Sequence, residues 1–283
     1  GTLAAFATFA IGFIARPLGG VVMGHFGGRL GRKFMLVWAL MLMGLSTLGI
    51  GLLPTYAQIA GWAPVLLTTL RFIQGFALGG EWGGAVLMSV EHAPHGRRGL
   101  FGSVVAMGLP AGIVLSNLVF IIVTTVLSPE QFATWGWRIP FIASVVLVAI
   151  GMFVRLSIAE SPIFADVLRA GSARRMPVMD VLRTDARTVL LAAGSYVGIS
   201  GLGYILLVYF VTYATRPLGL ALPTALMLIV LASVAGAPGT MWFAHLSDRI
   251  GRRRIMQSGL GALVIWSVFF FPLVDTGSIP LIA

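Results

Sequence analysis

One apolar segment, at about residues 64–90, carries polar side chains on a single face. Arg71, Gln74 and Glu81 project within an arc of about 80° if the segment is a helix that turns 100° per residue. A charge in membrane hydrocarbon costs at least about 2.5–3.5 kcal/mol, so Arg71 and Glu81 should each face a cavity or a partner. The stripe predicts part of a binding site or ion pathway. A structural interhelical pair without ligand contact is the alternative.

Polar groups also interrupt other apolar segments. Arg16 lies beside Pro17 in the middle of residues 2–24, where it either lines the cavity or extends to the membrane surface. Two arginines inside a membrane favour an anionic ligand, because guanidinium groups match carboxylates. Asn117 and Tyr204 could hydrogen-bond the same ligand from other segments, or could simply be packed.

The residue types give little support to enzymatic chemistry. The sequence has no cysteine and four scattered histidines, so it offers neither a metal cluster nor a nucleophile with its base. It also lacks a Gly-x-x-x-x-Gly-Lys-Ser/Thr loop for ATP. We predict no enzymatic activity, no cofactor and no metal. A membrane enzyme for lipid-linked substrates and a receptor that binds without translocating are the alternatives to transport.

Long apolar segments must hold these groups in place. Hydrophobic residues make up 58% of the chain and charged residues only 10%, which is too little polar surface for a soluble globule of this size. The segments exceed the length of barrel strands and do not alternate with period two, so the predicted fold class is all-α integral membrane. We expect eight spans, at about residues 2–24, 34–53, 64–90, 100–127, 138–158, 187–214, 222–243 and 255–273.

The positive charge follows membrane topology. The formal net charge is +10, but most Lys and Arg residues fall in alternate connections between spans, as expected for cytoplasmic loops. The connections at 54–63 and 274–283 carry none. We therefore predict a lipid bilayer rather than nucleic acid as the partner of these charges, and we expect the chain to start and end outside.

A cationic loop occurs twice in the sequence. Aligning Gly31 with Gly251 also aligns the flanking histidines and arginines, and both copies are predicted to be cytoplasmic, so the repeat is parallel. We expect a first half over residues 1–158 that lacks its first helix, a cytoplasmic linker over 159–186, and three helices of a second half over 187–283. One more helix before residue 1 and about three after residue 283 would complete about twelve.

Several motifs resemble one family of membrane proteins. They are Arg16-Pro17-Leu18-Gly19-Gly20, Gly24-His25-Phe26-Gly27-Gly28-Arg29-Leu30-Gly31-Arg32-Lys33, Arg71-Phe72-Ile73-Gln74-Gly75, Gly79-Gly80-Glu81-Trp82-Gly83-Gly84, Trp135-Gly136-Trp137-Arg138-Ile139-Pro140-Phe141 and Glu160-Ser161-Pro162-Ile163-Phe164. The second resembles the signature loop of the major facilitator superfamily, and the set resembles its metabolite:proton symporter group. The resemblance implies the fold of that superfamily, ties an arginine like Arg71 to proton coupling, and makes Glu81 a candidate proton carrier.

The two cationic loops are predicted to form a cytoplasmic gate. Asp248 in the second loop can accept hydrogen bonds from Arg252 or from an arginine of the other half, whereas Gly28 replaces this aspartate in the first loop and predicts a weaker latch. The alternative is that the basic residues only fix topology. Glu91, Arg98 and Glu160 resemble ion-pair partners of related sugar porters, or are solvated helix ends. The whole predicted network is Gly24, Arg29, Gly31, Arg32, Lys33, Glu91, Arg98, Glu160, Asp248, Arg249, Gly251, Arg252 and Arg253.

Glycines also recur along the polar segment. Gly75, Gly79 and Gly83 are spaced by four residues and predict a face that packs closely against another helix.

These observations favour a secondary active transporter. We predict proton-coupled uptake of a small polar metabolite, expected to be an organic acid, by alternating access. The expected partners are the substrate, the proton and the lipid bilayer, and the expected form is a monomer. The expected location is a cell membrane, as a multi-pass protein of the bacterial inner membrane.

Overall fold

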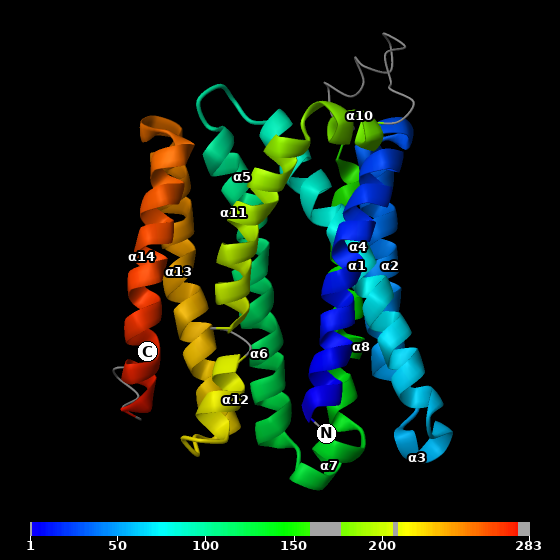
Figure 1. Ribbon diagram of the computed structural model, residues 1–283. Helices are drawn as coiled ribbons and strands as arrows, with labels where there is room; N and C mark the ends of the chain where they lie inside the picture. Colours follow the sequence, from blue (N-terminus) through cyan, green and yellow to red (C-terminus); the bar gives the residue numbers. More distant parts are fainter. Residues whose placement is uncertain (1, 159–176, 206–208, 277–283) are drawn as a thin grey trace. The chain divides into compact units, whose positions relative to one another are not determined.

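The computed structural model describes residues 2–158, 177–205 and 209–276, and these residues form helices and turns without a strand (Figure 1). They divide into two compact units that do not follow chain order. The first comprises Gly1–His92 and Pro129–Arg183, and the second comprises Ala93–Ser128 and Thr184–Ala283. The two halves predicted from the sequence repeat, at residues 1–158 and 187–283, are a different division of the chain. That division stays a prediction.

Four long helices build the first unit: α1 (Thr2–Leu30), α2 (Arg32–Leu52), α4 (Trp62–Glu91) and α8 (Ile139–Ser157). Helix α4 packs against both α1 and α2, and α2 also packs against α8. The short elements α3 (Tyr56–Ile59), α7 (Pro129–Thr134) and η1 (Gly136–Arg138) connect the long helices, and α3 and α7 lie at the same end of this unit (Figure 1). Helix α10 (Pro177–Thr184) begins after the predicted linker's undescribed part.

Glycines allow α1 and α4 to approach closely. A Cβ atom at Gly75 would lie 1.9 Å from the carbonyl oxygen of Gly12, and one at Gly79 would lie 2.0 Å from that of Arg16. Both distances are far below van der Waals contact, so only glycine fits at these positions. A Cβ at Gly83 would meet no atom within 4 Å among the described residues. The predicted close-packing face is therefore observed at Gly75 and Gly79 but not at Gly83.

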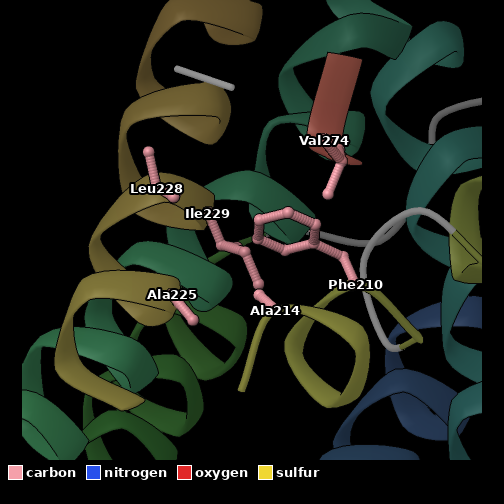
Figure 2. Packing of buried hydrophobic residues seen from close by; sticks show 6 residues of the cluster. All are labelled: Phe210, Ala214, Ala225, Leu228, Ile229 and Val274. Atoms are coloured by element: carbon pink, nitrogen blue, oxygen red, sulfur yellow. The ribbon is translucent and has the colours of Figure 1, made fainter. Parts of the chain in front are cut away.

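The second unit has a core at one end of its helices. Its elements are α5 (Arg98–Ala106), α6 (Gly108–Val126), α11 (Ala186–Tyr204), α12 (Phe210–Thr215), α13 (Leu222–Ile250) and α14 (Arg252–Asp275). Helix α13 packs against α5, α6, α12 and α14. Figure 2 shows the core, in which Phe210 of α12 lies among apolar side chains of α13 and α14. The buried cluster is Phe210, Ala214, Ala225, Leu228, Ile229 and Val274.

The repeat is visible in backbone geometry. Helices α1 and α13 each have 29 residues, and each is separated from the next helix by one glycine. Gly31 has φ 108° and ψ 145°, and Gly251 has φ 96° and ψ 142°. Positive φ favours glycine because it has no Cβ. The two cationic loops predicted from the sequence are thus largely helix ends joined by a single glycine. The charged residues that flank each glycine therefore belong to rigid helices.

Five helical stretches among the described residues are long and apolar enough to cross a membrane: Arg32–Leu52, Arg98–Val126, Gly136–Ser157, Leu222–Ile250 and Arg252–Asp275. The predicted spans at 2–24 and 64–90 correspond to α1 and α4, which carry Arg16, Arg71 and Glu81. The predicted span at 187–214 corresponds to α11 and α12, with residues 206–208 outside the described part. The expected eight segments are therefore all matched by helices.

Candidate functional site

A cavity of about 230 Å³ lies between α1, α2 and α4 in the first unit. It brings together Arg16, Arg71 and Gln74, three of the residues predicted to form the site. The complete lining is Gly12, Phe13, Arg16, Met43, Thr47, Arg71, Gln74, Gly75 and Leu78. The lining contains two guanidinium groups and no carboxylate, so its charge complements an anion.

Hydrogen bonds connect the polar lining residues across two helices. Arg71 Nη1 on α4 donates to Gln74 Oε1 at 3.1 Å, and Gln74 Nε2 donates to Thr47 Oγ1 on α2 at 2.6 Å. The Arg16 guanidinium lies 3.9 Å from the centre of the Phe13 ring, a distance typical of a cation–π contact. Each polar side chain is thereby held in a defined orientation at the cavity.

Glu81 does not belong to this lining. Its carboxylate accepts a hydrogen bond from Arg155 of α8, and the two side chains are 16% and 19% exposed. Arg155 also donates to the carbonyl oxygen of Leu36 on α2. The polar stripe of α4 therefore splits into a cavity part around Arg71 and an ion pair around Glu81. The two charged groups have different partners, as their separation along the helix predicts.

Sequence reasoning missed Thr47 and Arg155. Thr47 lies in a segment that was assigned only as an apolar span, and the adjacent pair Ser46-Thr47 is the signal that could have drawn attention to it. Arg155 lies near the end of the predicted span at 138–158 and has no predicted role, and the structure places it in the last turn of α8. A carboxylate such as Glu81 inside a membrane helix needs a cationic partner, and that need could have drawn attention to Arg155.

The second cationic motif reaches the start of another helix. Asp248 on α13 accepts hydrogen bonds from the backbone amides of Gly99, at 2.8 Å, and Leu100, at 3.1 Å. These amides lie in the first turn of α5, where no preceding residue of the same helix can accept from them, and Arg97 supplies no side-chain cap. The carboxylate therefore satisfies two amides and lies at the positive end of the helix dipole.

Asp248 also lies within ion-pair distance of Arg252, one of the partners expected from the sequence. Arg252 Nη2 lies 3.8 Å from Asp248 Oδ1, but the Arg252 side chain is 67% exposed, and backbone amides rather than an arginine make the short contacts. The side chain of Asp248 is only 7% exposed. Capping a helix takes precedence because the amides are fixed, whereas an exposed arginine retains its solvation.

The first cationic motif makes its contacts inside the first unit. Arg32 forms an ion pair with Glu91 at the end of α4, and Lys33 Nζ donates to the carbonyl oxygen of Leu156 at 2.7 Å. These contacts join α2 to α4 and to α8. Gly28, at the position that corresponds to Asp248, provides no carboxylate.

The remaining predicted residues are not brought into either cluster. Arg98 begins α5 beside the capped amides, and its side chain is exposed, as are Arg29, Arg249 and Arg253. Gly24 lies within α1 and Gly251 joins α13 to α14.

Asn117 on α6 and Tyr204 at the end of α11 are half-buried in the second unit. Glu160 lies outside the described residues. Within the described ranges, no three His, Asp or Glu side chains are grouped to hold a metal ion.

Comparison with known proteins decides the family. A family model described as "Major Facilitator Superfamily" matches residues 2–283. The chain belongs to the Major Facilitator Superfamily. Its fold and its multi-pass membrane class, both predicted from the sequence, are thereby confirmed.

Curated superfamily relatives match along almost the whole chain. The "Inner membrane metabolite transport protein YhjE" of Escherichia coli K12 is 43% identical over 282 residues, which is 98% of this chain and 64% of that protein. The "Shikimate transporter" of the same organism is 41% identical over 288 residues, 99% of this chain and 64% of that protein. A "Putative proline/betaine transporter" of Staphylococcus aureus is 35% identical over 274 residues, 96% of this chain and 59% of that protein.

The chain thus spans about two thirds or less of these superfamily members. None of the three is named as an enzyme, in agreement with the prediction from the sequence.

Solved superfamily structures have the same fold. The proton:xylose symporter XylE bound to 6-bromo-6-deoxy-D-glucose aligns with a TM-score of 0.67 at 17% identity, over 86% of this chain and 59% of that one. A partially occluded inward-open form of XylE from E. coli aligns with a TM-score of 0.66 at 18% identity, over 99% of this chain and 72% of that one. At this identity the likeness establishes the superfamily fold alone.

Proposed function

We propose that this superfamily member is a secondary active transporter that takes up an organic acid anion together with a proton, by alternating access. The observation that carries the proposal is the cavity between α1, α2 and α4, where Arg16 and Arg71 contribute two positive charges inside the membrane helices.

A carboxylate is the ligand that fits this charge best. An arginine side chain presents a planar fork of N–H donors that matches the two oxygens of a carboxylate. Five of the nine lining residues are apolar or glycine and four are polar, which suits a small ligand with a short carbon skeleton. The name of the E. coli shikimate transporter points the same way, because shikimate is a carboxylic acid.

The proton pathway rests on fewer contacts. Glu81 is a half-buried acidic group in the middle part of α4, and its ion pair with Arg155 would break when the carboxylate gains a proton. We assign Glu81 the role of proton carrier and Arg155 the role of its counter-ion. The expected cellular location is the inner membrane of a bacterium, because one relative is named as an inner membrane protein. The monomeric form stays a prediction.

The gate is proposed at the cytoplasmic helix ends. Asp248 closes the start of α5 onto α13 through Gly99 and Leu100, while Arg32 and Glu91 join α2 to α4. Each contact is weak enough to break during a cycle, because one cap contributes about 0.5–2 kcal/mol. A set of such contacts that break together would separate two conformations.

The test is uptake by the natural protein that contains this sequence, in proteoliposomes with a panel of labelled carboxylates and betaines. Uptake should be saturable for a carboxylate and should increase with an inward proton gradient. Arg71→Gln should abolish uptake. Arg254→Gln should leave uptake unchanged, because Arg254 is an exposed cation on α14 outside the predicted gate.

Betaine uptake without carboxylate uptake would contradict the anion proposal and would favour the zwitterionic class named for the S. aureus relative. Carboxylate uptake that ignores the proton gradient would contradict the coupling alone.

A further inference from the structure

A directional chain of hydrogen bonds runs from α2 to the Arg71 guanidinium. The Thr47 hydroxyl donates to the carbonyl oxygen of Met43 one turn earlier in α2, at 2.7 Å. Its oxygen then accepts from Gln74 Nε2 at 2.6 Å, and Gln74 Oε1 accepts from Arg71 Nη1 at 3.1 Å. All four residues except Arg71 are uncharged, and all four are half-buried and line the cavity.

The direction of the chain follows from the chemistry of its members. A guanidinium can only donate, so Gln74 must turn its amide oxygen toward Arg71 and its NH₂ group toward Thr47. Thr47 can receive that NH₂ group because its own hydrogen is already given to Met43. A residue at position 47 without an oxygen would leave the Gln74 donor unsatisfied at the cavity wall.

We propose that Thr47 is a positioning residue of the anion site: through Gln74 it holds the Arg71 guanidinium in the orientation that receives the substrate carboxylate. Thr47 makes no contact with the substrate in this scheme. Thr47 keeps Gln74 in place to accept one N–H of the Arg71 guanidinium. The remaining N–H donors of that guanidinium are then held in one orientation toward the substrate carboxylate. The inference rests on the proposed function, in which Arg71 binds the anion.

The position on α2 gives this role a structural basis. Arg71 and Gln74 lie one turn apart on α4 and could reorient together, whereas Thr47 belongs to a different helix that packs along α4. The hydrogen bond between Thr47 and Gln74 therefore fixes the orientation of Arg71 relative to α2 as well as to its own helix α4. The threonine is itself held by its bond to the backbone, so its hydroxyl has little freedom to turn away.

The test uses Thr47→Val in the natural protein, with Thr47→Ser as the conservative variant. Valine keeps the shape of the side chain and removes its oxygen, and serine restores the oxygen. Thr69→Val is the matched control, because Thr69 on α4 makes the same bond to a carbonyl one turn earlier, at 2.9 Å to Val65, and is exposed. Thr47→Ala serves as the second variant if valine perturbs packing.

Two readouts separate this inference from the proposed function. The first is KM against Vmax for the transported carboxylate, where Thr47→Val should raise KM about tenfold with less than about a twofold change in Vmax. The second is the reaction of Arg71 with phenylglyoxal in the purified protein, quantified by peptide mass spectrometry relative to the exposed Arg252. Thr47→Val should raise the Arg71 reactivity, and Thr47→Ser and Thr69→Val should resemble the unmodified protein in both readouts.

A second substitution tests whether Thr47 acts through Gln74. In a Gln74→Ala background, Thr47→Val should have no further effect on KM or on Arg71 reactivity; additive effects would overturn the chain. Equal results for Thr47→Val and Thr69→Val would overturn the role of Thr47 altogether. If no carboxylate is transported, the proposed function fails, and the phenylglyoxal reaction still decides whether Thr47 orients Arg71.

Discussion

Arg155 on α8 binds the carboxylate of Glu81 on α4, and the two side chains are buried to a similar degree, with exposures of 19% and 16%. The same guanidinium donates to the carbonyl oxygen of Leu36, so one side chain joins α2, α4 and α8. An ion pair that shares its cation with a helix backbone stabilises the packing of three elements at once.

Removing either member of this pair should destabilise the first unit. Arg155→Gln should lower the free energy of unfolding by about 2 kcal/mol, since it leaves the Glu81 carboxylate largely buried without its partner. Glu81→Gln should lower the free energy of unfolding by less, because Arg155 still donates its hydrogen bond to the carbonyl oxygen of Leu36. The measurement is chemical unfolding in detergent micelles. The double variant should recover about 1 kcal/mol of the summed loss, and strictly additive losses would show that the pair does not couple.

Asp248→Ala should open the contact between α5 and α13. The loss of the cap should cost about 1 kcal/mol and should increase the maleimide labelling of a cysteine placed at Ser103, which is 6% exposed on α5. The sequence has no natural cysteine to interfere. Arg252→Gln is the control, because Arg252 is exposed and 3.8 Å from the carboxylate. Equal labelling in the two variants would mean that Asp248 does not hold the helices together.

Alanine substitutions along α4 should separate close packing from helix propensity. Gly75→Ala and Gly79→Ala place a Cβ within 1.9 and 2.0 Å of α1 carbonyl oxygens, so each should destabilise by at least about 1–3 kcal/mol and impair transport. Gly83→Ala has open space and should be neutral or should stabilise by up to about 1 kcal/mol. Thermal unfolding of the three variants in one detergent checks the order. A destabilised Gly83→Ala variant would contradict the geometry.

Gly28→Asp should strengthen the first cationic motif as a latch. Gly28 corresponds to Asp248, and a carboxylate there could cap a helix start or pair with a nearby cation, as Asp248 does at Gly99. We expect slower labelling of a cysteine placed at Leu30, which is 58% exposed, and slower transport. Gly28→Asn tests the charge without changing the shape, and should have the smaller effect. Unchanged labelling in the aspartate variant would favour a purely topological role for the basic residues.

The helical class, the positions of the long helices and the repeated pair of glycine-linked helices could all be predicted from the sequence. Apolar length and charge placement are local properties, and glycine at positions 31 and 251 reports a backbone conformation that other residues rarely adopt. The stripe of Arg71 and Gln74 could also be found, because helical periodicity fixes which side chains of one helix share a face.

The partners of those side chains depend on the tertiary structure. Glu81 and Arg155 are 74 residues apart, Gln74 and Thr47 are 27 apart, and Asp248 and Gly99 are 149 apart. Each partner is an ordinary residue of its own helix, and its local sequence pattern does not show which side chain of another helix it meets. Which of them meet depends on how the helices pack, and that packing is set by long-range contacts such as the glycine approach between α1 and α4.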